Sequence, residues 1–159
     1  MIKPLMQCSL IFALAGATGC DQSLSRLEEG LADAMEKWET QGYVDYSMRF
    51  GRSCFCGPGD LEATVHIEAG AVVAFEAATA FDDTLSDSLL VAWDITLSSF
   101  KSVQELFGVI EEAIRLDADD IAVTYNGALG YPQLIDIDYN IEIIDEEIVY
   151  HASDVVEKL

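Results

Sequence analysis

Two cysteines separated by one residue, Cys54 and Cys56, carry the most distinctive chemistry in this chain. In an extended strand their side chains point to the same face, with Cα atoms ~6.6 Å apart, near the upper limit for a disulfide. The turn predicted at Gly57-Pro58-Gly59 supplies a bend that would bring the two sulfur atoms into range. Outside the cytoplasm a disulfide is their expected state, and it would hold the end of a strand.

Zinc binding and redox catalysis are the alternatives for this cysteine pair. Together with His66 and His151, Cys54 and Cys56 would supply the four ligands of a structural zinc site. The spacing of the four residues matches no zinc motif, and each histidine fits the solvated face of a strand. A redox centre of the thioredoxin type needs a surrounding βαβ pattern, which this sequence lacks. The disulfide is therefore favoured, and zinc is kept as an alternative.

A second group of polar residues has the offsets of a calcium-binding loop. Its candidate ligands are Asp136, Asp138, Asn140 and Glu147. The sixth position of such a loop needs a glycine for its sharp turn, and here it is Ile141. The alternation of polar and apolar residues through this segment predicts a strand with a solvated face instead. Calcium binding on these residues or on the acidic loops remains an alternative.

Nucleophilic catalysis finds no support among the sequence motifs. The chain has no G-x-S-x-G, no H-E-x-x-H and no glycine-rich phosphate loop, and its two histidines form no visible triad. Paired acidic residues are frequent, but 29 acidic residues make such pairs expected by chance. No catalytic residue and no cofactor is therefore predicted.

The first 20 residues predict where the protein resides. Lys3 supplies a positive charge, an apolar run follows from residue 5 to residue 15, and small residues come directly before Cys20. This is the pattern of a secretory signal peptide, and it is too short to span a bilayer. Small residues that end on a cysteine resemble the lipobox of bacterial lipoproteins. Cys20 would then carry the lipid, and its acyl chains, palmitate among them, would hold the protein on a membrane.

Cleavage would leave a chain long enough for one domain with its own core. The expected division is a lipoprotein signal peptide over residues 1–19, a tether over 20–24 and one globular domain over 25–159. The formal net charge of −21 opposes binding to nucleic acid and direct contact with anionic lipid headgroups. We therefore expect a bacterial envelope protein that lies outside the cytoplasm and touches the membrane through its lipid. An unidentified protein or small molecule would be its partner.

Hydrophobic periodicity predicts the elements that position these residues. An apolar stripe predicts a helix over 23–41, in which Ser25 and Glu28 form a capping box. Ser102 and Glu105 form a second capping box at the start of another helix. Residues 79–100 are expected to form a long acidic loop, which would be a variable or binding element. Alternation and the turns that bound each segment predict six strands, over 43–53, 61–68, 71–77, 121–126, 133–142 and 148–152.

The order of these elements, αβββαβββ, predicts an α+β fold. Strands joined by short turns pair antiparallel, so the six would form one antiparallel sheet. Alternation implies one solvated face, and the two helices would pack on the other. The repeated order also suggests a degenerate internal duplication.

Several short sequences, taken together and in order, resemble the bacterial domain-of-unknown-function family 6174. The resemblance runs from about residue 30 to residue 155 and implies an envelope protein of this architecture with no assigned activity. It therefore supplies no catalytic residue. The segments that carry it are Trp38, Gly42-Tyr43-Val44-Asp45-Tyr46, Arg52-Ser53-Cys54-Phe55-Cys56, Ser102-Val103-Gln104-Glu105-Leu106-Phe107, Tyr125-Asn126, Leu129-Gly130-Tyr131-Pro132 and Ile137-Asp138-Tyr139.

A lipid-anchored, non-catalytic module for binding or assembly is the function these observations favour. A divalent-metal-binding protein is one alternative, with calcium on the acidic loops or zinc on the cysteines and histidines. An inhibitor-like module that presents its sheet to a partner protein is another, by analogy of architecture.

Overall fold

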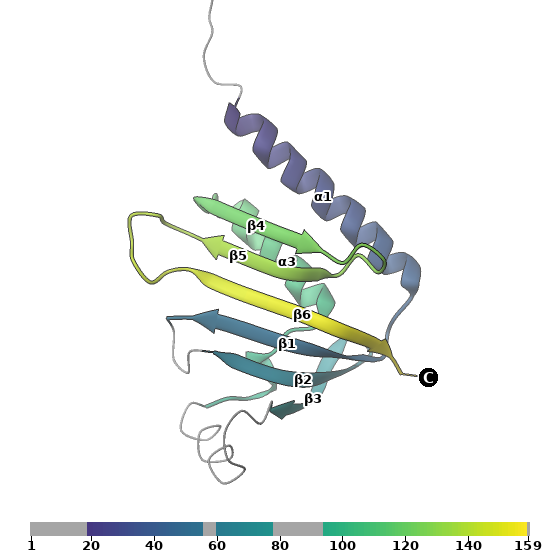
Figure 1. The fold of residues 1–159 in the computed structure, drawn as a ribbon. Helices are drawn as coiled ribbons and strands as arrows, with labels where there is room; N and C mark the ends of the chain where they lie inside the picture. The colour runs from purple at the N-terminus through teal and green to yellow at the C-terminus, as the bar shows by residue number, and fades with distance from the viewer. Residues whose placement is uncertain (1–18, 56–59, 78–93, 159) are drawn as a thin grey trace, which may run out of the picture.

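The computed structural model describes residues 19–55, 60–77 and 94–158, which form an α+β fold (Figure 1). It contains two helices, a short 3-10 helix that the sequence did not predict, and a six-stranded antiparallel sheet. The elements in chain order are α1 (Gly19–Gln41), β1 (Tyr46–Cys54), β2 (Leu61–Glu68), β3 (Ala71–Ala77), η1 (Leu97–Ser99), α3 (Val103–Arg115), β4 (Asp120–Tyr125), β5 (Pro132–Asp138) and β6 (Ile148–Glu157).

The strands lie in the order β3-β2-β1-β6-β5-β4, so the first and last strands pair at the centre of the sheet. In the suggested duplication β1 would correspond to β4. Instead β1 is central and β4 is an edge strand, and the two run in opposite directions through the antiparallel ladder. The two halves of the chain are therefore not arranged as equivalent repeats.

The period-two alternation of the strands sorts their side chains between a buried and an open face. In β1 and β2 the odd-even pattern is clear, and Met48, Val65 and Ile67 are each at most 1% exposed. The register places Met48 opposite Val65 and Phe50 opposite Ala63, so buried residues of neighbouring strands meet on one side. The opposite side carries polar residues such as Glu62 and Thr64.

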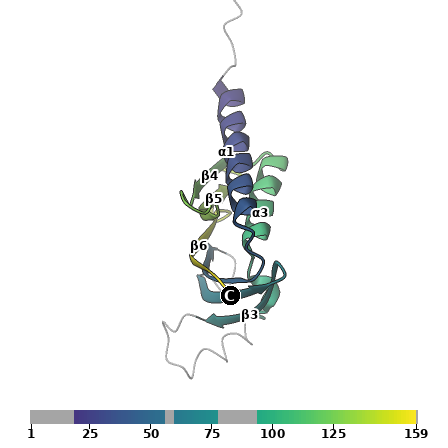
Figure 2. The ribbon, with the colours of Figure 1, turned by 90° about the vertical axis from the view of Figure 1, so that its right-hand side faces the viewer.

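Both helices contact the buried side of β1 through Tyr46. The Trp38 ring of α1 lies edge-on to the Tyr46 ring at a centroid distance of 5.3 Å. The Tyr46 hydroxyl accepts a 2.9 Å hydrogen bond from the backbone N–H of Val103, at the first turn of α3. This bond satisfies one of the donors that a helix N-terminus leaves unpaired. Figure 2 shows α1 and α3 running next to each other.

Helix α1 begins earlier than the sequence predicts. It starts at Gly19, so residues 20–24, predicted as a tether, belong to the helix, and Ser25 lies inside it and cannot act as its N-cap. The capping-box pattern at Ser25 was therefore a wrong prediction of the start. The predicted end is confirmed, because Gly42 follows α1 with a φ of +70°, a conformation that glycine adopts without strain. Within the described residues no helix is long and apolar enough to cross a membrane.

Several strand boundaries also differ from the prediction. β5 ends at Asp138 because a tight turn follows, whereas the alternation predicts a strand to residue 142. β6 runs to Glu157, five residues beyond its predicted end, because its C-terminal part pairs with β1. Strands β2 and β3 have the predicted bounds.

The capping box at the start of α3 is confirmed. Ser102 is fully buried, its hydroxyl accepts from the Glu105 N–H at 3.4 Å, and its own N–H donates to the Glu105 carboxylate at 2.7 Å.

We expect Ser102→Ala to lower the free energy of unfolding by ~1 kcal/mol, because the Glu105 N–H loses its acceptor. Urea denaturation measures this loss. Glu105→Gln keeps the reciprocal bond and should lose clearly less, and equal losses would contradict the assignment.

Candidate functional site

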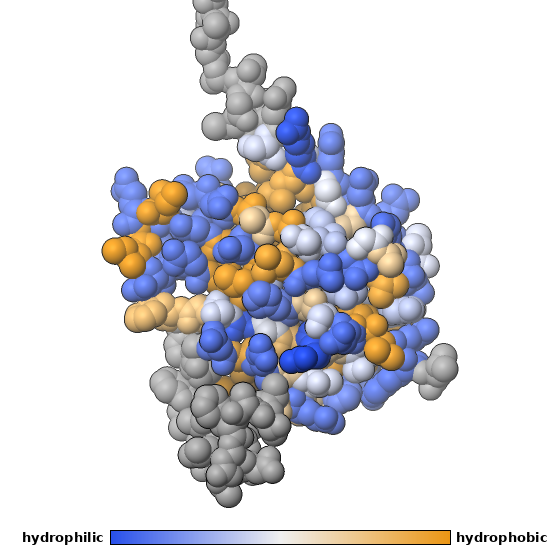
Figure 3. Space-filling view, in the orientation of Figure 1, coloured by the Kyte–Doolittle hydropathy of each residue, from blue (hydrophilic) through white to orange (hydrophobic). Residues whose placement is uncertain are grey.

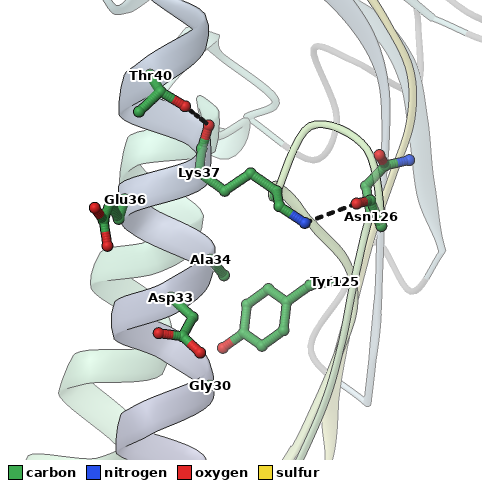
Figure 4. Close-up of a pocket in the computed structure, with 10 residues that line it drawn as sticks. Gly30, Asp33, Ala34, Glu36, Lys37, Thr40, Tyr125 and Asn126 are labelled. Atoms are coloured by element: carbon green, nitrogen blue, oxygen red, sulfur yellow. Dashed lines mark hydrogen bonds between the residues drawn. The ribbon is translucent and has the colours of Figure 1, made fainter.

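A groove of about 590 Å³ lies between α1 and the turn that joins β4 to β5 (Figure 4). The helix supplies one wall, the end of β4 and the following turn supply the other, and both walls carry polar groups. The lining residues are Gly30, Asp33, Ala34, Glu36, Lys37, Thr40, Tyr125, Asn126, Gly127 and Gly130.

The β4–β5 turn comes close to the backbone of α1 at Gly130, which also lines the groove. Gly130 has a φ of +88°, and a Cβ at this position would lie 2.5 Å from the Ala34 carbonyl oxygen. Beside this contact the Lys37 ammonium donates a 2.7 Å hydrogen bond to the Gly127 carbonyl oxygen. A backbone contact and a charge-assisted bond therefore fix the turn on the helix.

Asn126 holds the turn in shape from within. Its side-chain oxygen accepts hydrogen bonds from the backbone N–H groups of Ala128 at 3.0 Å and Leu129 at 2.8 Å. Its backbone N–H donates to the Tyr131 carbonyl oxygen, and its carbonyl oxygen accepts from Gly130. The sequences Tyr125-Asn126 and Leu129-Gly130-Tyr131-Pro132 thus build one rigid wall of the groove.

Tyr125 is the most unusual polar residue of the site. Its hydroxyl is buried and has no hydrogen-bond partner among the described residues, a state that costs on the order of 1–3 kcal/mol. Burial raises the pKa of Tyr125 to about 12. Figure 4 shows the ring extending from β4 toward α1, with its hydroxyl near Asp33 and Gly30. An added methyl at Gly30 would lie 4.0 Å from the ring, so the glycine leaves space above it.

The acidic groups that line the groove are free to bind a ligand, whereas its lysine already has a partner. Asp33 and Glu36 are exposed carboxylates, whereas the Lys37 ammonium is engaged by Gly127. Figure 4 shows Asp33 directed toward the Tyr125 side of the groove and Glu36 directed away from it. The site can therefore accept a positively charged or hydrogen-bonding group, with Asp33 as acceptor and Tyr125 as donor or acceptor.

We expect the buried tyrosines to make folding sensitive to alkaline pH. Burial raises the pKa of Tyr46 to about 12, as it does for Tyr125. In the unfolded chain both tyrosines would titrate near ~10. The stability that they contribute to the folded state is therefore complete below pH ~10 and is lost as pH rises toward ~12. Each should then contribute ~2 kcal/mol less to the free energy of unfolding near the upper limit.

Urea denaturation across this pH range measures the effect. Tyr46→Phe and Tyr125→Phe should each flatten the alkaline decline, since phenylalanine does not titrate. A decline that keeps its slope in both variants would assign it to other groups.

The predicted cysteine sites are only partly within the described residues. Cys54 is the last residue of β1 and lies opposite Ile148 of β6. Cys56 lies outside the described residues, so the disulfide stays a prediction. Cys20 is in the first turn of α1.

The two histidines of the zinc alternative do not meet. His66 lies opposite Ser47 and His151 opposite Gly51, on the two sides of β1. Four residues of strand, ~13 Å, separate these two positions along β1. His66 instead lies 3.4 Å from the Glu76 carboxylate. No group of three or more potential metal ligands occurs among the residues described.

The candidate calcium ligands serve the backbone of the β5–β6 loop. The Asp138 carboxylate accepts from the Asn140 N–H at 2.9 Å, and the Asn140 side-chain oxygen accepts from the Glu142 N–H at 3.1 Å. Asp136 is exposed on β5, and Glu147 is exposed directly before β6. The acidic offsets are thus explained, for Asp138 and Asn140, by hydrogen bonds that shape a loop.

The predicted acidic loop is described only at its end. Residues 78–93 lie outside the described range, together with Asp82, Asp83 and Asp87. The remainder includes η1 and then Phe100, which is 2% exposed and packs against Phe50 and Phe75. This end of the segment therefore belongs to the core.

The groove residues were not predicted as a site. Asp33 and Lys37 read as polar positions of an amphipathic helix, and Tyr125 as the end of a strand. The one available signal was the pair Gly127 and Gly130, which predicts a turn but not the helix that it touches.

Of three comparisons with known proteins, one finds a match. A family model described as a family of unknown function, DUF6174, matches residues 30–157. No curated protein and no solved structure matches the chain.

Proposed function

We propose, from the premise that this chain belongs to the DUF6174 family of unknown function, that it is a lipid-anchored binding module of the bacterial cell envelope. In this proposal Cys20 carries the lipid, and the groove between α1 and the β4–β5 turn holds a ligand without transforming it. The groove is the observation that supports a binding function, because the unpaired Tyr125 hydroxyl and the exposed Asp33 carboxylate lie near each other in it.

The shape of α1 supports an anchor at its N-terminal end. Residues 23–29 are largely exposed, and the first buried residue of the helix is Leu31. Figures 1 and 2 show the start of α1 projecting beyond the sheet and beyond α3. A lipid on Cys20 would therefore hold the folded body away from the membrane surface, with the groove accessible along the helix.

Metabolic labelling with a palmitate analogue tests the anchor. The full-length protein should take up the label and sediment with membranes, and Cys20→Ala should lose both properties. Cys8→Ala is the matched control and should keep them. An unlabelled protein, or label that survives Cys20→Ala, would overturn the anchor and leave the groove untouched.

The chemistry of the groove favours a ligand with a positively charged group. Asp33 supplies a carboxylate near the Tyr125 hydroxyl, and Lys37, the cation of the lining, is already bonded to Gly127. A cationic ligand group beside Asp33 could also pair with the buried hydroxyl, and that would remove an unsatisfied polar group from the protein. The net charge of the chain, −21, favours the approach of such ligands.

Site-directed photo-crosslinking in intact cells tests the groove. A benzophenone amino acid at Thr40, in the groove, should form a defined adduct, whereas one at the exposed Ser98 should not. Asp33→Asn should weaken the adduct, and Glu29→Gln, a matched change on α1 outside the groove, should leave it intact. Equal adducts at both positions, or no effect of Asp33→Asn, would contradict binding in the groove.

We propose in addition that a disulfide between Cys54 and Cys56 clamps the end of β1 and that both helices cover the same face of the sheet. The disulfide is supported by the extracytoplasmic location proposed above. Intact mass measured with and without reductant should differ by the mass of two hydrogen atoms. Thiols that are free before reduction would contradict it.

A further inference from the structure

The loop between β5 and β6 presents three isoleucines to solvent from a well-defined backbone. Ile141 is 75% exposed, Ile144 is 86% exposed and Ile143 is 47% exposed. Exposed apolar residues are common singly, but a cluster on one loop is typical of an interaction surface. Figure 3 shows hydrophobic side chains gathered at this end of the molecule.

Hydrogen bonds hold the loop in this conformation. The Asp119 carboxylate accepts from the Ile141 N–H at 2.9 Å, and the Asn140 carbonyl oxygen accepts from the Ile143 N–H at 2.8 Å. The Asp138 and Asn140 side chains bond two further backbone N–H groups of the same loop. The isoleucines are therefore displayed by a preorganised backbone, which lowers the entropic cost of docking.

A fourth exposed apolar residue lies at the same end of the sheet. Phe55 is 81% exposed and follows Cys54, which pairs with Ile148 at the start of β6. The chain thus leaves β1 at Phe55 beside the point where the loop enters β6. Phe55 and the three isoleucines together are called the apolar end.

The apolar end is surrounded by negative charge. Two arginines lie toward this end of the sheet, Arg115 at the end of α3, which forms an ion pair with Glu112, and Arg52 near the end of β1. Acidic residues outnumber them in the segments around the apolar side chains. They are Asp117, Asp119, Asp120, Glu142, Asp145, Glu146 and Glu147.

We propose that the apolar end binds a cationic, amphipathic segment of a partner protein, with lysine or arginine next to apolar side chains. The charge pattern decides between occupants. An anionic membrane surface would be repelled by the acidic rim, and a second copy of this chain would bring two acidic rims together. A basic segment gains both apolar burial and charge attraction. This surface is separate from the groove, so the proposal for one can be wrong while the proposal for the other is right.

Binding of defined peptides to the full-length protein tests the proposal. The probe is a synthetic amphipathic peptide of lysine and leucine, and its counterpart has glutamate in place of lysine. The lysine peptide should bind, and its affinity should fall as salt rises toward 1 M, where the screening length falls to ~3 Å. The glutamate peptide should not bind. Ile141→Ser/Ile144→Ser should weaken binding by about tenfold or more.

Matched controls separate the apolar end from general attraction to an acidic protein. Val156→Ser removes an apolar side chain of similar exposure, 60%, from β6, and should leave peptide affinity unchanged. Hydrogen exchange should show new protection at the amides of residues 139–147 in the complex. The variants change exposed side chains, so unfolding by urea should be unaltered.

Four outcomes would overturn the proposal. The lysine peptide could fail to bind, or could bind equally to the double variant. Vesicles of phosphatidylglycerol could bind in a manner that depends on Ile141 and Ile144, which would assign the surface to lipid. Sedimentation could show a dimer that the double variant abolishes, which would assign it to a second copy.

Discussion

Gly130→Ala is expected to lower the free energy of unfolding by about 3 kcal/mol or more. Two effects add at this position. The φ of +88° costs an L-residue about 1–2 kcal/mol. The new Cβ would in addition lie 2.5 Å from the Ala34 carbonyl oxygen, 2.9 Å from the Lys37 Cβ and 3.0 Å from the Trp38 nitrogen. Since two of these atoms are helix backbone, the β4–β5 turn would have to move away from α1.

Gly70→Ala is the matched control, because it separates the conformational cost from the clash. Gly70 has a φ of +78°, and a Cβ there would meet nothing within 4 Å. It should therefore lose only about 1–2 kcal/mol. Urea denaturation of both variants measures the difference, and equal losses would show that the turn is free to shift at little cost.

The same substitution also probes the proposed site. Displacement of the turn would widen the groove and weaken the Lys37 bond to Gly127, which lies in the same contact. We expect the crosslink from Thr40 to fall in Gly130→Ala and to persist in Gly70→Ala. Stability and ligand contact would then be lost through one local change.

The strands were the part of the fold most open to prediction from sequence. Leu61–Glu68 alternates strictly, and Ala69 and Gly70 both take positive φ in the turn that leads into Ala71–Ala77. Alternation of this kind is a local signal, so it fixes the bounds of a strand and the face that it buries. It does not fix which strands become neighbours. The pairing of β1 with β6 joins the two ends of the domain and has no local signature.

Capping patterns were informative only where tertiary contacts agreed with them. The patterns at Ser25 and at Ser102 have the same form, but only Ser102 starts a helix. At Ser102 the Tyr46 hydroxyl pairs with the next backbone N–H and fixes the start of α3. At Ser25 the preceding residues continue the helix back to Gly19, so the pattern lies inside α1.

The candidate site was beyond prediction because its parts are distant in the chain. Lys37 and Gly127 are 90 residues apart, and their hydrogen bond exists only once α1 lies on the β4–β5 turn. The calcium-like spacing of acidic residues misled for a different reason, because it does reflect local structure. Asp138 and Asn140 accept hydrogen bonds from backbone N–H groups in the loop, and the residue types that do this are also those that bind calcium.

Trp38→Ala is expected to lower the free energy of unfolding by about 3–5 kcal/mol, the range for loss of a large buried aromatic side chain. Trp38 is 6% exposed and lies edge-on to three tyrosine rings. Its centroid distances are 5.6 Å to Tyr43, 5.3 Å to Tyr46 and 6.3 Å to Tyr131. Pairs of this geometry contribute ~0.5–1.5 kcal/mol each beyond the area that they bury.

The loss should exceed that of a substitution elsewhere on α1 because Trp38 joins three parts of the fold. Tyr43 precedes β1, Tyr46 begins it and holds α3, and Tyr131 lies directly before β5. Trp38→Phe should keep part of this packing and lose less, and the exposed Glu39→Ala should change the free energy of unfolding by less than ~0.5 kcal/mol. A loss below ~1.5 kcal/mol for Trp38→Ala in urea denaturation would mean that the tyrosines close the cavity without the indole.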